Sequence, residues 1–184
     1  GALLEACQGV GAELLIDAYH STNVAPLSLL EERLDGAFVV GGGYKYLQIG
    51  EGNGWLRFPR DCQLRPVLTG WFGEFATMAD KKSASGGPDA ESRVSYAEGP
   101  PRFAGATYDP TSHYRAASVL DFFADQRLTQ DRLRACSQHQ VGLLMTEFDA
   151  LDLDPAAVQR DRSVPLKSVA GFLALTSPDA PLIA

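Results

Sequence analysis

The run Phe38-Val39-Val40, followed by three glycines, constrains the fold of this chain more than any other segment. An apolar, β-branched run without polar alternation is typical of a strand that is buried on both faces. The glycines at positions 41–43 end this strand, and Lys45 follows between Tyr44 and Tyr46. A lysine just beyond a buried strand and walled by aromatic rings is placed to lose its proton and act as a nucleophilic amine. On position alone, an ordinary surface lysine at a strand end fits the same pattern.

A second apolar run predicts another buried strand, from Glu13 to Asp17, with His20 shortly after it. Between the two strands, Pro26 to Leu34 is expected to form a short helix. A further strand is expected from Trp55 to Phe58. Strands with continuous apolar runs that alternate with helices predict an α/β fold, with a parallel or mixed sheet covered on both faces.

The composition excludes several classes of function. The chain has 184 residues and a net charge of −7, which argues against a nucleic-acid or anionic-membrane surface. No apolar stretch approaches the length needed to span a bilayer, and no signal peptide is visible. The three cysteines are widely spaced without a CxxC pair, so we expect free thiols in a reducing, cytoplasmic compartment and no metal site.

The rest of the chain divides into segments that differ in composition and in hydrophobic periodicity. Residues 2–8 predict a helix, and residues 112–151 predict a long helical stretch that breaks near Asp125 to Asp131. Met78 to Pro101 is polar, rich in glycine and serine, and is expected to be a loop. Gly171 to Thr176 is expected to be a strand, and Ser177 to Ala184 the opening of another helix. Because elements at both ends lack partners, we expect a piece of a longer protein.

The strand-end residues together suggest pyridoxal phosphate as a cofactor. This cofactor needs a lysine for its aldehyde, a carboxylate for its pyridine nitrogen and donors for its phosphate. Lys45 suits the first role and Asp17 the second, although an aspartate after a strand is commonly a turn residue. His20 could stack on the ring or donate to a substrate oxygen, or be an ordinary loop histidine.

Two other segments could contribute to a site. Trp71, flanked by Gly70 and Phe72-Gly73, could reach a ligand or a neighbouring surface, or anchor a core. Thr107, in the run from Gly105 to Pro110 before a helix, could offer a hydroxyl and backbone N–H groups to a phosphate, or cap the helix. The glycine-rich run from Gly50 to Gly54 leads into a strand and not a helix, which argues against a nucleotide loop.

Taken together, these segments resemble the fold-type I pyridoxal-phosphate enzymes of the class V aminotransferase group, and within it kynureninase and its relatives. The matching runs are Asp17-Ala18-Tyr19-His20, Gly43-Tyr44-Lys45-Tyr46-Leu47, the glycine-containing residues 50–54 and Gly70-Trp71-Phe72-Gly73. The resemblance covers most of residues 14–151. It implies a three-layer α/β/α large domain with a mainly parallel sheet, of which residues 1–151 are the C-terminal half. Residues 152–184 would begin a smaller C-terminal α+β domain.

The resemblance also implies roles for single residues. Lys45 would hold the cofactor as a Schiff base and later shuttle protons at the substrate α-carbon. Asp17 would pair with the pyridine nitrogen, and His20 would lie near the 3-hydroxyl edge of the ring. Tyr44 would reach the phosphate and assist proton transfer.

Trp71 and the loop at Thr107 would reach across a dimer interface toward the cofactor of the partner subunit, so the resemblance implies a homodimer. The implied reaction is hydrolytic cleavage of a β–γ carbon bond in an amino acid. The run from Gly105 to Pro110 departs from kynureninases toward the Gly-x-Thr loop of cysteine desulfurases and aminotransferases. Transamination, desulfuration or a lyase step therefore stays open, as does a non-catalytic, truncated relative.

Overall fold

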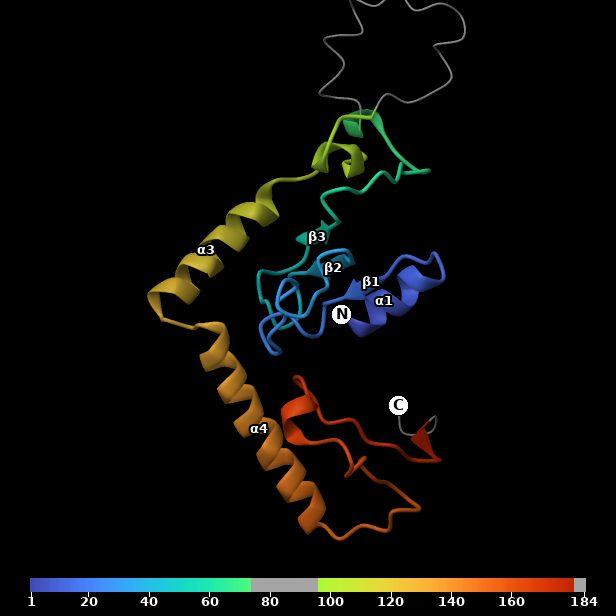
Figure 1. The fold of residues 1–184 in the computed structure, drawn as a ribbon. Coiled ribbons are helices and arrows are strands. Elements are labelled where there is room, and N and C mark those ends of the chain that lie inside the picture. The colour runs from blue at the N-terminus through green and yellow to red at the C-terminus, as the bar shows by residue number, and fades with distance from the viewer. Residues whose placement is uncertain (74–95, 181–184) are drawn as a thin grey trace, which may run out of the picture. The chain divides into compact units, whose positions relative to one another are not determined.

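The structure is a computed structural model that describes residues 1–73 and 96–180. Contacts divide the chain into two units. The first unit comprises Gly1–Arg57 and Thr111–Ala184, and the second comprises Phe58–Pro110. The first unit contains the three-stranded sheet and the α-helices that the structure describes, which are labelled in Figure 1.

A three-stranded sheet in the order β1-β2-β3 forms the centre of the first unit. Strand β1 (Leu15–Asp17) pairs with β2 (Phe38–Gly42) in parallel, with Asp17 opposite Val40. Strand β3 (Gly54–Arg57) pairs with β2 antiparallel, with Gly42 opposite Gly54. The predicted α/β class is therefore confirmed, and the sheet is mixed. The domain boundary expected after Leu151 stays a prediction.

The three glycines after Val40 each meet a close neighbour. A Cβ at Gly41 would overlap the ring of Trp55, and a Cβ at Gly42 would overlap the ring of Tyr19. A Cβ at Gly43 would overlap the side chain of Ile49. Glycine is thus needed at these positions because aromatic and aliphatic groups pack directly on the backbone.

A small apolar core lies between helix α1 (Ala2–Gly9) and the strands. Leu4, Leu34 and Ala37 are buried there, and Leu14 and Ile16 pack against them. Helix α1 is confirmed at the expected place. Its burial of Leu4 fixes the helix on the segment that leads into β2.

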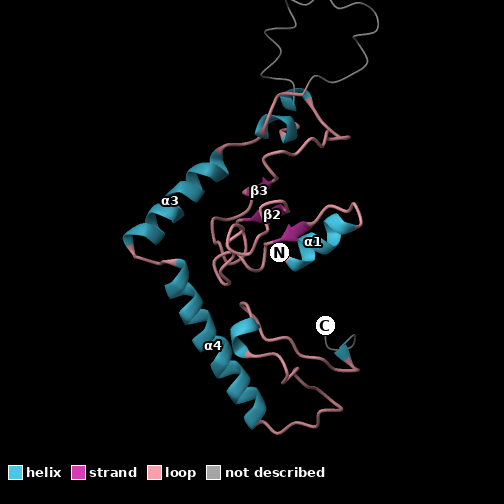
Figure 2. Cartoon of the chain, viewed as in Figure 1, coloured by secondary structure: helices cyan, strands magenta, loops and turns pink. Residues whose placement is uncertain are grey.

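The long helical stretch is two helices, as expected. Helix α3 (Thr111–Asp125) and helix α4 (Gln130–Ala150) are separated by a turn in which Arg127 has φ 53°. Thr129 caps α4, since its hydroxyl accepts a hydrogen bond from the N–H of Arg132 at 3.3 Å. The described residues after α4 are mostly loop, which is pink in Figure 2, and include the 3-10 turn η4 (Leu166–Ser168).

Two element predictions are wrong. Residues 26–34 form irregular backbone and turns and not a helix, because their backbone hydrogen bonds close separate turns, such as those from Glu32 to Ser28 and from Arg33 to Leu30. Residues 171–176 are not a strand, since their backbone makes a single antiparallel bridge, between Gln159 and Thr176. Most of the loop expected from Met78 to Pro101 lies outside the described residues, as does the second half of the helix expected from Ser177.

The second unit is held by side chains that bind backbone carbonyls. Arg102, in the 3-10 turn η3 (Pro100–Phe103), donates from Nη1 to the carbonyl of Cys62 at 2.9 Å. The rings of Phe58 and Phe103 pack at a centroid distance of 4.5 Å.

Across the ranges that the structure describes, no helix has both the length and the apolar character to cross a membrane.

Candidate functional site

The candidate site lies where the parallel strands β1 and β2 end. Asp17 is the last residue of β1 and is level with Val40 of β2. Strand β2 continues to Gly42, and Lys45 follows three residues later in a bend. Because β1 and β2 are parallel, their carboxyl ends share one edge of the sheet, which is where open α/β sheets bind ligands.

The amine of Lys45 is in contact with the ring of His20. Nζ lies 2.7 Å from Nε2 and 3.2 Å from Nδ1 of His20. A ring nitrogen that carries no proton can accept a hydrogen bond from the amine, and a protonated ring nitrogen can return a proton to it. The pair can therefore hold or exchange a proton at Nζ. The sequence places the two residues 25 positions apart, so this contact depends on the pairing of β1 with β2.

Two tyrosine rings surround the same amine. Nζ of Lys45 lies 5.6 Å from the ring centroid of Tyr19 and 5.6 Å from that of Tyr44. The two rings are themselves 5.7 Å apart. An ammonium group at this distance from aromatic faces gains a cation–π attraction. Lys45 is half-buried, whereas Tyr44 is exposed, so the site opens to solvent on the Tyr44 side.

Asp17 is exposed and has a local partner. Its Oδ1 accepts a hydrogen bond from the N–H of Tyr19 at 2.9 Å, which is the turn role that aspartates after strands commonly take. The other carboxylate oxygen is not used in this bond. Asp17 and Lys45 both lie at the carboxyl edge of the β1–β2 pair, as the sequence predicts.

The other two predicted residues belong to the second unit. Trp71 is half-exposed, with its ring 4.5 Å from that of Phe72. Thr107 is exposed in the loop before α3. The segments that carry them touch, because a Cβ at Gly70 would overlap the carbonyl oxygen of Gly105. The second unit thus brings the Trp71 and Thr107 segments together.

Sequence reasoning missed a polar stripe on α4. Four side chains from its first half donate to carbonyls of the loops that follow His20 and η4. They recur at helical spacing, which is the signal that could have identified them. The stripe consists of Gln130, Arg134, Ser137 and Gln138.

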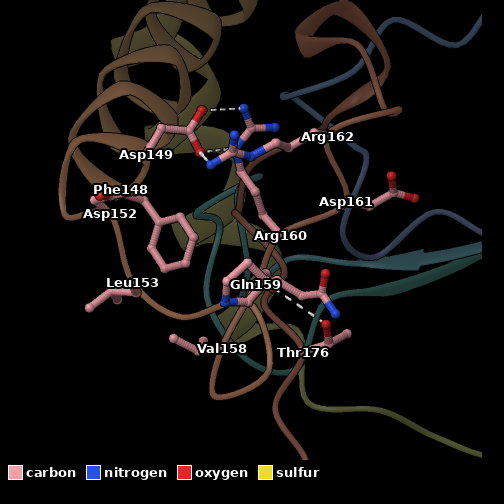
Figure 3. A pocket seen from close by; sticks show the side chains of 11 residues that line it. Phe148, Asp149, Asp152, Leu153, Val158, Gln159, Arg160, Asp161, Arg162 and Thr176 are labelled. Carbon is pink, nitrogen blue, oxygen red and sulfur yellow. Dashed lines mark hydrogen bonds and ion pairs between the residues drawn. The ribbon is translucent and has the colours of Figure 1, made fainter.

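A separate hollow of about 640 Å³ lies beyond the end of α4 (Figure 3). Arg160, whose side chain is 11% exposed, donates to both oxygens of Asp149, from Nε at 2.9 Å and from Nη2 at 2.5 Å. Nη2 of Arg162 lies 3.4 Å from Oδ1 of Asp149. The hydrogen bond from Arg160 lowers the pKa of Asp149, and the same bond raises the pKa of Arg160.

The pKa of Asp161 is lowered by hydrogen bonds from the hydroxyl and N–H of Ser163. Both arginines that line this hollow are therefore paired with Asp149, as Figure 3 shows. The described residues contain no cluster of histidine, cysteine or carboxylate side chains that could hold a metal ion. The Lys45 site is the stronger candidate for chemistry, since its amine is neutralised by no carboxylate among the ion pairs described.

Comparisons of the sequence with protein-family models and with curated proteins gave no match. The resemblance to kynureninase-like enzymes therefore rests on the residues themselves and stays an expectation.

Proposed function

We propose that this chain is part of a pyridoxal-phosphate-dependent enzyme that acts on an amino acid. The observation that carries the proposal is the contact between Lys45 Nζ and His20 Nε2, at 2.7 Å, at the edge where two parallel strands end. A primary amine, a carboxylate and hydroxyl groups are the donor set that this cofactor requires. The residues present therefore fit the group in their chemistry.

Each residue has a role in this proposal. Lys45 holds the cofactor through its amine, and His20 takes or returns a proton at Nζ. Asp17 offers its free carboxylate oxygen to a protonated ring nitrogen, and Tyr44 offers its hydroxyl to the phosphate or the substrate. When bound, pyridoxal phosphate supplies an electron sink beside the substrate α-carbon.

The reaction we favour is kynureninase-like hydrolytic cleavage of a carbon–carbon bond, because Tyr44 and Trp71 stand in the motifs that resemble that branch. Transamination, desulfuration or a lyase step is the second candidate, which the run from Gly105 to Pro110 favours because it resembles the Gly-x-Thr loop of cysteine desulfurases and aminotransferases. The proposal includes the three-layer large domain and the cytoplasmic location. It also includes a homodimer in which Trp71 and Thr107 lie at the shared cofactor site. Product analysis with amino acids that do or do not carry a γ-carbonyl separates the two reactions.

Borohydride trapping tests the proposal. The chain is incubated with pyridoxal phosphate and reduced, and the modified peptide is mapped by mass spectrometry. We expect stoichiometric label on Lys45 and only background label on Lys167, which is exposed and lies in η4. Lys45→Ala should abolish the stoichiometric label.

The matched control is Lys167→Ala, which should leave the label on Lys45 unchanged. Label spread evenly over all lysines, or none on Lys45, would show that the chain has no assembled cofactor site.

A further inference from the structure

The turn that carries Lys45 is fastened at its base by backbone hydrogen bonds. Gly43 donates from its N–H to the carbonyl of Asn53 at 2.8 Å, and its own carbonyl accepts from the N–H of Gly50 at 3.2 Å. Lys45 follows Gly43 by two residues. The backbone that presents the amine therefore starts from a point that residues 49–53 hold.

The 49–53 turn is buried at Ile49 and has a left-handed backbone on either side of it. Gln48 has φ 58° and Gly50 has φ 80°. Ile49, which is 8% exposed, packs on Gly43, where a Cβ would overlap its side chain. A residue other than glycine keeps a left-handed backbone only where its surroundings fix it, so this turn depends on the groups that bind its carbonyls.

Asn53 and the first turn of α3 supply these groups. Asn53 donates from Nδ2 to the carbonyl of Ile49 at 3.1 Å and to the carbonyl of Ser112, in α3, at 2.9 Å. Arg115, one turn into α3, donates from Nε to the carbonyl of Ile49 at 3.1 Å and from Nη2 to that of Glu51. The carbonyl of Ile49 thus accepts from two side chains, and Asn53 joins the turn to α3.

The amine of Lys45 contacts residues that follow the other strand. Nζ lies 2.7 Å from Nε2 of His20 and 5.6 Å from the ring centroid of Tyr19, and both residues follow β1. A lysine amine stands on a flexible stem, so a loosened backbone would let it leave these rings. The placement of the 49–53 turn therefore decides whether the amine stays in its site.

We propose that Asn53 and Arg115 are positioning residues, which fix the turn that presents the Lys45 amine to His20 and the tyrosine rings. They act through the backbone carbonyls of the 49–53 turn. The inference rests on the proposed function only in taking this amine as the reactive group.

Lysine-selective ¹³C labelling tests this positioning by NMR on the whole chain, without any cofactor. Protons that lie over the face of an aromatic ring are shifted upfield by the ring current. Because Nζ of Lys45 lies over two tyrosine rings, its Hε signal should lie upfield of that of Lys167, which is exposed in η4. Lys45→Arg identifies the Lys45 signal by its loss, and the separation of the two signals measures how closely Lys45 is held at the rings.

Two variants loosen the turn in different ways. Asn53→Asp removes both amide donors with almost no change of shape, and Arg115→Met keeps an apolar stem but removes the guanidinium. Each variant should lose most of the separation between the Lys45 and Lys167 signals. The thermal midpoint of each variant is measured as well, so that a general loss of stability is recorded separately.

Arg102→Met is the matched control. Arg102 also donates to two backbone carbonyls, those of Cys62 at 2.9 Å and Leu64 at 3.4 Å, but it lies in the second unit. The same chemical change at this place should leave the Lys45 signal where it is, whatever it does to the thermal midpoint.

A Lys45 signal that stays in place in Asn53→Asp and Arg115→Met would overturn the inference, as would an equal movement in Arg102→Met. Either of the first two variants decides the question if the other does not fold. Loss of the separation, in a chain whose Lys45 takes no pyridoxal-phosphate label, would keep the positioning and remove the cofactor. Label on Lys45 of the unaltered chain, with an unmoved signal in both variants, would keep the cofactor and remove the positioning.

Discussion

At the residue scale, the role of each side chain depends on the residues that it contacts. Asp149 accepts two hydrogen bonds from Arg160, and the ring of Tyr19 packs against the backbone of Gly42. Lys45 has its role because His20, 25 residues away in sequence, lies 2.7 Å from its amine. Each of these contacts joins segments that are separated along the chain, so each can be tested by one substitution.

The Asp149–Arg160 pair should make stability depend on pH at the acid end. The bond from Arg160 lowers the pKa of Asp149 in the folded chain below its ordinary value near 3.8. A lowered folded pKa means that the stabilisation is present above the ordinary value and is lost as the pH falls through the folded value. Asp149→Asn should therefore lower the thermal midpoint at pH 7, and the difference from wild type should shrink below about pH 4.

Asp152→Asn is the matched control for this measurement. Asp152 has φ 47°, which asparagine tolerates well, so its replacement should leave the midpoint nearly unchanged. A difference between wild type and Asp149→Asn that stays constant from pH 7 to pH 3 would contradict the assignment to the carboxylate charge.

Gly42→Ala should destabilise the sheet at the end of β2. The added Cβ would overlap the Tyr19 ring, and Gly42 is buried in β2, so the strand or the ring must shift. Overpacking of this kind costs about 1–3 kcal/mol of unfolding free energy, measurable by chemical denaturation. Gly9→Ala, at the end of α1 with nothing within 4 Å of its Cβ, should leave stability unchanged or slightly raised. Equal effects of the two substitutions would argue against the close packing at Gly42.

At the scale of elements, α4 has two different faces. Its apolar residues form the pattern that predicts a helix, while its polar stripe fastens two loops by their carbonyls. Arg134 alone binds the carbonyls of Val24, Lys167 and Val169. The helix is thus a support for the loop after His20 and for the loop after η4.

Arg134→Ala should loosen both loops together. Hydrogen exchange of the amides of Ala25 and Val169 should quicken roughly tenfold or more, since bonds to charged donors stabilise by about 1.5–3 kcal/mol. The amides of β2 should be unaffected. Arg132→Ala, which removes only a bond to the carbonyl of Gln126 at 3.3 Å, should leave both loops unchanged. Faster exchange in only one loop would show that Arg134 does not couple them.

The elements also show what sequence patterns can predict. The strands around Val39 and Ile16 and the helices around Val119 and Val141 were predictable from apolar spacing. The burial expected of both strands holds for β2 alone, since Leu15 and Asp17 of β1 are exposed. The turns at residues 26–34 were not predictable, because a proline at the start and Asp-Gly at the end border a loop as readily as a short helix. Residues 171–176 carry a strand-like pattern, but a strand forms only where a partner strand is present.

At the scale of the whole molecule, the two units divide the predicted site. Asp17, His20, Tyr44 and Lys45 lie in the first unit, and Trp71 and Thr107 lie in the second. The sequence placed Asp17 at the end of one strand and Lys45 just beyond the end of the next, and the pairing of β1 with β2 agrees with this placement. It could not predict that His20 touches the amine, or that Phe172 touches His20, because both contacts depend on how loops fold back.

The chain has two tryptophans, and each unit contains one of them. Trp55 covers Gly41 in the pairing of β2 with β3, and Trp71 lies in the second unit. The molecule therefore carries a separate intrinsic fluorophore for each half of its structure. With Trp71→Phe the emission comes from the sheet alone, and with Trp55→Phe it comes from residues 58–110 alone. Unfolding of the two halves can thus be followed separately by fluorescence, without any attached dye.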